Sequence, residues 1–422
     1  MVVVGKRVTV GICGGGPGGS TLAFCLGRLG GFQVTVLEKR SDLKGGYKID
    51  FRGKAVEAFQ KMEIYETVRK IQTDYKKAMV TINGSYTVEM ESDAFGARTG
   101  KDLEVMRGLF CQTIYKAAQE TGNVTFKFNQ SIQDITEHSD GVHVTLESGK
   151  KYQFDLLVGA DGLHSQVRKL VFEQPIQESG SQFQEFKHKL GVSLCYVQLP
   201  ENFLPNNEEE AQFIGCGRFV EIFNIPGQGT IAAFAFSSAS IAEHCHRDIE
   251  GLKNFLIKDY SKGDIQWSMM GQLLKTIQKA PNEHFYFSEA TQVRMPTWSK
   301  GRVVLIGDAA ACPSPLTGQG GSFAILSGYI LARELFKSQG NHKSAFFAYH
   351  QALYEFVQKN QKLADINVEI IKNNKSLKAR VIRLTMNNIP MWLTSYIQKR
   401  FTSRIGQAAN AVELGEDFLS KR

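Results

Sequence analysis

The amino-terminal region holds a glycine-rich turn whose spacing suits the pyrophosphate of a dinucleotide. Gly14, Gly16 and Gly19 form the pattern G-x-G-x-x-G directly after an apolar run typical of a buried strand. We expect Gly14 to make the tight turn, Gly16 to let a pyrophosphate approach, and Gly19 to pack the following helix closely. Pro17 and Gly18 lie in the first turn of that helix, whose free N–H groups and positive dipole end attract phosphate.

The end of the next apolar run carries a carboxylate that narrows the choice of dinucleotide. Glu38 follows Gly19 by about twenty residues, where a carboxylate binds a ribose 2′-hydroxyl. Because a carboxylate repels a 2′-phosphate, NADP is disfavoured at this site, and NAD and FAD remain open. Lys39, the next residue, is a further candidate contact of the dinucleotide.

A second motif, "GADGLHSQVRKL", ends another apolar run with a sharp turn. Asp161 and Gly162 form the turn, and Ser165 is a candidate cap for a helix that begins near Gln166. Taken alone, this pattern is a common loop.

A third motif, "GRVVLIGDAAACPSPLTGQGGSFAI", combines an aspartate with a glycine-rich helix start. Asp308 stands at the carboxyl end of a buried strand, where it can accept hydrogen bonds from sugar-alcohol hydroxyls. Gly318, Gly320 and Gly321 let backbone N–H groups approach a flat ring. Those groups and the helix dipole would stabilise negative charge on the ring.

The cysteines and histidines do not predict a metal site. The seven cysteines are scattered without a C-x-x-C pair, which argues against a disulfide framework or a zinc knuckle. The cluster His244-Cys245-His246 brings no further ligands at metal spacing. We therefore expect no bound metal.

The net charge of +8 belongs to one segment of the chain. Between Lys372 and Arg404 there are Lys and Arg residues but no Asp or Glu, and the rest of the chain is close to neutral. A nucleic-acid groove is therefore not predicted. The basic segment could lie on a membrane surface, but packing across two domains is the favoured interpretation.

The elements around these motifs predict two interleaved units. Residues 7–38 form one parallel strand–helix–strand unit, and residues 181–295 alternate as antiparallel strands interrupted by one helix. Residues 301–336 then return to the first pattern. No apolar run could span a bilayer, and the opening is too short for a signal peptide, so a cytoplasmic protein is expected.

In their order along the chain, the three motifs resemble those of the class A flavoprotein monooxygenases, which share the p-hydroxybenzoate hydroxylase fold. The resemblance covers roughly residues 5–360. It implies that the first motif binds the ADP half of FAD and that Asp308 binds the ribityl chain. It also implies that Asp161 contacts FAD and the nicotinamide donor.

Two shorter matches extend the resemblance. "GGYKIDFRG" is similar to the loop that passes near the isoalloxazine ring, so Asp50 and Arg52 are candidates there. Arg107 matches the arginine that reaches FAD from an early helix, although a structural salt bridge is the competing interpretation. Pro315 is a further candidate contact of the cofactor; it lies in the loop at residues 313–321, which we call the ring loop.

The implied fold class is α/β: a Rossmann-like FAD-binding domain, an inserted antiparallel-sheet substrate domain and a C-terminal helical extension. We expect the FAD-binding domain to be formed by residues 1–75, 100–178 and 290–370, the substrate-binding domain by 76–99 and 179–289, and the C-terminal helices by 371–422.

Within the family, "GGYKIDFRG", "CPSPLTGQGG" and the extension after Pro390 resemble the tetracycline-inactivating monooxygenases, or tetracycline destructases. Hydroxylases of secondary-metabolite pathways share much of this pattern. No second G-x-G-x-x-G is present, which argues against a separate nicotinamide domain. Trp267, Trp298 and Trp392 cannot form the signature of the flavin halogenases.

The resemblance implies that NADPH or NADH transiently reduces a non-covalently bound FAD. Reduced FAD would then react with O₂ to give a C4a-hydroperoxide that hydroxylates an electron-rich aromatic or polycyclic molecule. No side chain stands out as catalytic, because the flavin carries the chemistry. A flavin reductase or oxidase without oxygen insertion is the rival interpretation.

The predicted substrate contacts lie in the antiparallel strands and the ring loop. They are Arg218, Phe223, Pro315 and Leu316. Arg218 would anchor an anionic or enolate substrate, unless it pairs with Glu221. A monomer is expected.

Overall fold

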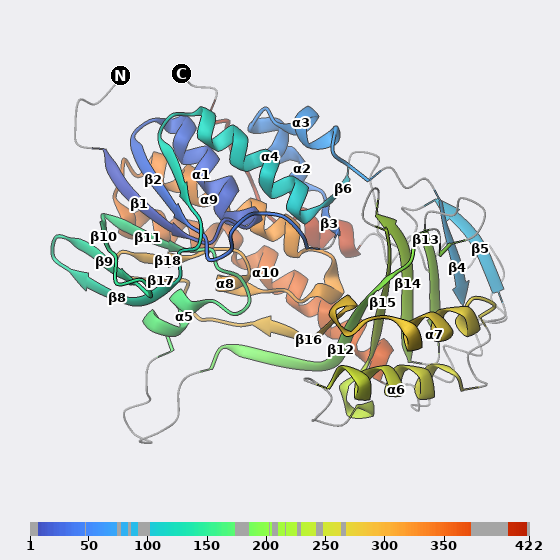
Figure 1. Ribbon diagram of the computed structural model, residues 1–422. Coiled ribbons are helices and arrows are strands. Elements are labelled where there is room, and N and C mark those ends of the chain that lie inside the picture. Colours follow the sequence, from blue (N-terminus) through green and yellow to red (C-terminus); the bar gives the residue numbers. More distant parts are fainter. Residues whose placement is uncertain are drawn as a thin grey trace.

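The computed structural model describes residues 7–46, 48–73, 77–82, 86–91, 102–173, 185–201, 203–204, 210–215, 217–225, 229–241, 248–262, 267–372 and 404–419. Two large sheets organise this part of the chain, and Figure 1 shows them side by side. No helix in these ranges has the length and apolar character to cross a bilayer.

The first sheet has six strands in the order β17-β18-β11-β1-β2-β7, and its strands run parallel except for β17. Its strands are β1 (Val8–Cys13), β2 (Phe32–Leu37), β7 (Val124–Lys127), β11 (Leu156–Gly159), β17 (Ser299–Lys300) and β18 (Val303–Leu305). Val10 and Val158 on one face and Leu157 and Val303 on the other are buried, as expected for a parallel sheet covered on both faces.

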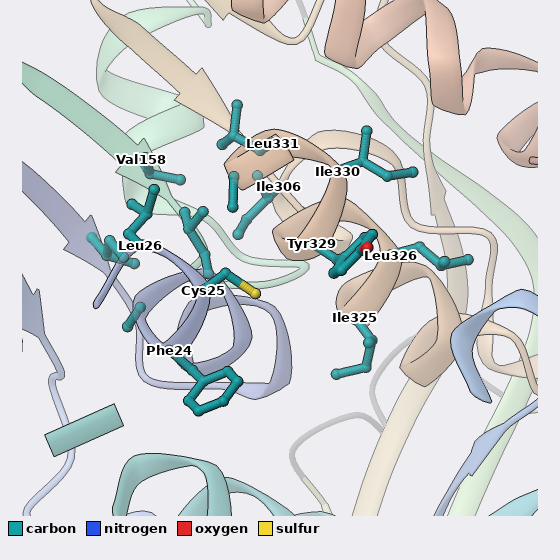
Figure 2. Packing of buried hydrophobic residues seen from close by; sticks show 14 of the residues in the cluster. Phe24, Cys25, Leu26, Val158, Ile306, Ile325, Leu326, Tyr329, Ile330 and Leu331 are labelled. Carbon is teal, nitrogen blue, oxygen red and sulfur yellow. The ribbon is translucent and has the colours of Figure 1, made fainter. Parts of the chain in front are cut away.

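Helices far apart in sequence pack on this sheet. They are α1 (Pro17–Leu29), α4 (Arg107–Glu120), α9 (Gly320–Lys337) and α10 (His342–Lys372). Figure 2 shows Phe24, Cys25 and Leu26 of α1 in one cluster with Ile325 and Tyr329 of α9. These helices cross closely at a glycine: a Cβ on Gly328 would lie 2.7 Å from the backbone oxygen of Gly18.

The second sheet has seven strands in the order β16-β12-β15-β14-β13-β4-β5. Its strands are β4 (Lys77–Ile82), β5 (Tyr86–Glu91), β12 (Lys187–Leu199), β13 (Glu210–Gly215), β14 (Arg218–Ile225), β15 (Gly229–Ser237) and β16 (Phe285–Val293). All neighbours are antiparallel except β4 and β13. One face packs on α6 (Ile249–Tyr260) and α7 (Met270–Lys279), and α10 contacts the sheet at β12 and β15.

Short elements connect these layers. A two-stranded sheet pairs β3 (Lys48–Phe51) with β6 (Leu103–Met106), and a three-stranded sheet contains β8 (Ile132–His138), β9 (Gly141–Leu146) and β10 (Lys151–Phe154). The remaining α-helices are α2 (Lys54–Lys61), α3 (Tyr65–Arg69), α5 (Gln166–Val171) and α8 (Asp308–Ala311), and η1 (Ser238–Ser240), η3 (Asn282–His284) and η4 (Pro315–Thr317) are short 3₁₀ turns.

The architecture is therefore α/β with a parallel Rossmann-like sheet, a separate mostly antiparallel sheet and helices toward the C-terminus, as the sequence predicts. Residues 373–403, which contain most of the basic segment, lie outside the described residues. A short helical segment follows at 404–409. Leu414, which follows this segment, is linked to α9, because Arg333 Nη1 donates a hydrogen bond to the Leu414 carbonyl at 2.7 Å.

Candidate cofactor and substrate site

The glycine turn between β1 and α1 exposes backbone at the edge of the six-stranded sheet. Gly14 has φ +106°, a conformation that favours glycine, and a Cβ on Gly19 would lie 2.0 Å from the Gly14 carbonyl oxygen. Gly16 caps α1 without a side-chain hydrogen bond, and Pro17 and Gly18 follow it in the first turn. The turn therefore presents N–H groups where a phosphate would be stabilised.

Glu38 lies directly against this turn. Its Oε2 accepts a hydrogen bond from the Gly15 N–H at 2.7 Å, and its Oε1 accepts one from the Arg40 N–H at 2.9 Å. The side chain is buried, whereas the adjacent Lys39 is exposed. Glu38 therefore fixes the turn as well as standing at the position expected for a ribose contact.

Arg107, the first residue of α4, approaches the same turn. Its Nη2 lies 3.6 Å from the position that a Cβ on Gly16 would occupy. Within the described ranges no ion pair of Arg107 is found, so the competing salt-bridge interpretation has no support there. A guanidinium beside a glycine turn suits an anionic ligand.

Asp308 begins α8 at the end of β18, directly after Gly307, which has φ +57°. Its Oδ1 is buried and has no hydrogen-bond partner. Burial raises the pKa of the Asp308 carboxyl, an effect partly opposed by a hydrogen bond with Cys312 and by the positive charge of Arg107. A buried acceptor without a donor is costly, and a ligand hydroxyl would supply the missing donor.

The ring loop lies along β3. A Cβ on Gly318 would stand 3.2 Å from Asp50 Oδ2, and one on Gly321 would stand 3.0 Å from the Asp50 carbonyl oxygen. Gly320 begins α9, and the preceding residue, Gln319, makes no side-chain cap. Asp50 and Arg52 form an ion pair at 2.8 Å, so the structure brings both together with this loop.

The turn at Asp161 and Gly162, which we call the DG turn, contacts both the following helix, α5, and the distant glycine turn at Gly14. The Asp161 carboxylate accepts from Ser165 Oγ and from the backbone N–H groups of Gln166 and Val167, and it therefore caps α5. Burial raises its pKa. Ser165 also caps α5, as predicted, by accepting from the N–H of Arg168. A Cβ on Gly14 would meet the backbone beside Asp161, which places the DG turn next to the first motif.

Arg168 is a residue whose role the sequence analysis missed. It is almost fully buried, and its guanidinium donates to the carbonyls of Leu163 at 2.7 Å and Ala309 at 3.0 Å. Its Nε also pairs with Glu173. The arginine therefore joins the DG turn to α8, and the only signal in the sequence was a basic residue on the helix after the turn.

Some of the unpartnered buried polar atoms lie on these segments. Ten buried side-chain nitrogen or oxygen atoms of the described residues lack a hydrogen-bond partner. Four of them belong to Arg52, Asp308 and Gln319, which lie on the loops described above. An extended molecule with hydroxyls and a polar ring would supply partners at such places, so the residues present fit FAD.

The predicted substrate residues divide between the two faces of the seven-stranded sheet. Phe223 packs with Met106, and Leu316 packs against the Leu194 and Ala235 cluster, so these residues lie on the face toward the ring loop. Pro315, beside Leu316, is exposed.

Arg218 is not on that face. It lies on the same strand face as Val220 and Ile222, which pack on the α6 side, and its Nε pairs with Asp259 Oδ2 of α6 at 2.6 Å. The expected substrate anchor is therefore corrected: the structure holds Arg218 in a buried ion pair behind the sheet. Glu221, the alternative partner, pairs with Lys48 instead.

The described residues contain no group of His, Cys, Asp and Glu that could hold a metal ion. The cluster at His244 and His246 lies outside the described residues.

Comparison with known proteins places these features among flavoenzymes. The FAD-binding domain family matches residues 7–204 and 271–360. A flavin-dependent monooxygenase of Legionella longbeachae is 32% identical over 361 residues, covering 85% of this chain and 88% of the relative. A second flavin-dependent monooxygenase, from an unknown prokaryotic organism, is 32% identical over 360 residues, with the same coverage of both chains.

Solved structures agree in fold. The tetracycline destructase Tet(55) superposes with a TM-score of 0.79 at 28% identity, over 99% of this chain and 100% of that one. Klebsiella pneumoniae HpxO, crystallised with FAD and uric acid, has a TM-score of 0.75 at 17% identity, over 98% of this chain and 100% of that one. At that identity the likeness to HpxO concerns the fold alone.

Proposed function

Because the chain belongs to the FAD-binding domain family and is a class A flavin-dependent monooxygenase similar to the tetracycline destructases, we propose that it uses NAD(P)H and O₂ to hydroxylate an electron-rich aromatic or polycyclic molecule. Tetracyclines are the first substrates to test, since Tet(55) and Tet(51) carry that name. A hydroxylase of a secondary-metabolite pathway is the alternative.

The observation that carries the proposal is the set of unpartnered polar atoms around the cofactor loops. The glycine turn and Arg107 would hold the phosphates, Glu38 the adenosine ribose and Asp308 the ribityl hydroxyls. The N–H groups at the start of α9 would face the ring and stabilise negative charge on it. FAD, when bound, supplies the redox chemistry and the activation of oxygen.

The remaining task of the chain is to orient the substrate and exclude water. The face of the seven-stranded sheet toward the ring loop carries Phe223, Ile225 and Ala233, and Met106 of β6 packs against them. Such an apolar wall limits the access of water to reactive species formed in the site.

The test begins with the purified protein and its visible spectrum. We expect bound FAD, its anaerobic reduction by NADPH or NADH, and ¹⁸O in the product when tetracycline is turned over under ¹⁸O₂. Protein incubated without nicotinamide cofactor is the control. Flavin reduction without ¹⁸O in tetracycline would exclude tetracycline as the substrate. Absence of ¹⁸O from a panel of electron-rich aromatic compounds as well would favour a reductase or oxidase, and failure to bind FAD would contradict the proposal as a whole.

A further inference from the structure

A buried ion network lies between the cofactor loop and the seven-stranded sheet. Lys48 on β3 places its Nζ 3.1 Å from Glu221, 3.6 Å from Glu104 and 3.9 Å from Glu210. The same Nζ lies 4.4 Å from the centre of the Phe223 ring. Four separate strands therefore contribute to one cluster, which we call the Lys48 network (Lys48, Glu104, Glu210, Glu221).

The position of the network follows from strand register. Gln212 stands opposite Glu221 and Glu210 opposite Phe223 on β13 and β14, so these side chains share the face that meets β3. Asp50, two residues after Lys48 on the same strand face, touches the ring loop. The Lys48 network is thus next to the place where the proposed function puts the substrate.

The charge of the network is unbalanced. One ammonium faces three carboxylates, which are poorly screened because all four side chains are mostly buried. Burial and the neighbouring carboxylates raise the pKa of Glu210 to about 8, although Lys48 opposes the shift. Even when Glu210 is counted as neutral, the formal charges of Lys48, Glu104 and Glu221 sum to −1.

A second observation points to a missing hydrogen-bond donor. Gln212 is buried, and its Nε2 donates to Glu210 and Glu221. Its Oε1 is buried without a partner. Since the Glu221 carboxylate can only accept, exchanging the two amide atoms would turn the Gln212 oxygen toward an acceptor and would not satisfy it. The Glu221 carboxylate and Gln212 Oε1 can therefore both accept hydrogen bonds from a donor outside the cluster.

We infer that the Lys48 network selects substrates that carry a protonated amine, with Glu221 and Gln212 Oε1 as acceptors for the ammonium. Glu221 is the most exposed carboxylate of the network, at 19%, and is therefore the one within reach of a ligand. The inference rests on the proposed function for the placement of the substrate. It makes carboxylate-bearing aromatics poor ligands, because Lys48 is already engaged by three carboxylates.

The experiment compares two fluorescent tricyclic probes on the FAD-loaded protein at neutral pH. One is 9-(aminomethyl)anthracene, a cation, and the other is anthracene-9-carboxylate, an anion of similar shape. We expect the wild type to bind the cation about tenfold more tightly, which corresponds to about 1.4 kcal/mol. Glu221→Gln, which keeps the size of the side chain, should reduce this preference to about twofold, and Gln212→Met should reduce it partly.

Glu289→Gln is the matched control. Glu289 is 19% exposed like Glu221, lies in the same sheet and pairs with a lysine, Lys189. Glu289 pairs across strands with Ser193, and its neighbour Ala290 packs in the cluster on the ring-loop side. Glu289 therefore points to the opposite face of the sheet. The preference for the cation should survive this change.

Three outcomes would overturn the inference: equal affinity for the two probes, no binding of either probe, or a preference for the cation that Glu221→Gln and Gln212→Met leave intact. The visible flavin spectrum and the anaerobic reduction by NADPH are recorded on the same samples. Normal flavin reduction with no charge preference would sink the amine selection alone. Loss of FAD from the wild type would contradict the proposed function instead.

Discussion

The two sides of the candidate site present different chemical groups: backbone groups on the cofactor side and side chains on the sheet side. On the cofactor side, the turn at Gly14 and the loop at Gly318 present backbone groups, and glycines keep side chains away. On the sheet side, Lys48, Glu221 and Phe223 present side chains brought together by strand register. The difference teaches that a shared cofactor needs a fixed backbone, whereas a particular substrate needs side chains that can vary.

The largest effect is expected from adding a methyl group to the glycine turn on the cofactor side. In Gly19→Ala the new Cβ would meet the Gly14 carbonyl oxygen at 2.0 Å, and that atom cannot move without opening the turn. We expect loss of FAD binding and a large fall in Tm, measured by flavin absorbance and thermal unfolding. Gly31→Ala is the control, because nothing lies within 4 Å of its Cβ position. FAD binding by Gly19→Ala at wild-type affinity would contradict the role assigned to the turn.

A polar change on the cofactor side should have the next largest effect. Asp308→Asn keeps the shape but replaces one acceptor oxygen by an N–H₂ group, so a ribityl hydroxyl loses its partner. We expect FAD affinity to fall about tenfold to a hundredfold, since a hydrogen bond to a charged group is worth about 1.5–3 kcal/mol. Titration of the apoprotein with FAD measures this. Asp365→Asn, at an exposed carboxylate of α10, should leave the affinity unchanged.

A substitution on the α6 face of the seven-stranded sheet should lower the stability of the protein and leave substrate binding nearly unchanged. Arg218→Met breaks the buried pair with Asp259, and we expect a loss of about 2–3 kcal/mol, because breaking buried pairs costs about 3–5 kcal/mol and Lys262 still neighbours Asp259. Urea unfolding measures the loss. Substrate affinity should change less than about twofold. A large fall in affinity without a loss of stability would restore Arg218 as a substrate anchor.

The smallest effect is expected from a pH titration of the sheet side. The pKa of Glu210 is raised in the folded protein to about 8, so folding binds a proton between its unfolded value and that pH. Its stabilising contribution is therefore complete at low pH and is lost as the pH rises through 8. We expect Glu210→Gln to flatten the decline of Tm between about pH 5 and pH 9. Parallel Tm curves for the two proteins would show that Glu210 does not titrate in this range.

The cofactor side could be predicted from the sequence because its function depends on local patterns. Gly14, Gly19 and Gly318 have special conformations or close contacts that only glycine tolerates, and such residues leave a readable spacing. Ser165 was predicted as a helix cap for the same reason, since a cap contacts its own segment.

The sheet side could not be predicted in the same way. Arg218 and Glu221 are three residues apart on one strand and so face opposite sides, yet the sequence does not say which side meets the cofactor. Arg168 reaches a carbonyl 141 residues away. Lys48 meets carboxylates on three other strands, and no spacing within a single segment encodes such a meeting.

The join between α9 and the C-terminal segment has a consequence for synthesis of the protein. Arg333 donates to the carbonyls of Glu413 and Leu414, which lie 80 and 81 residues further along the chain. The helix that these bonds secure begins at the ring loop. The helix therefore makes these contacts only after a segment some eighty residues later has been synthesised.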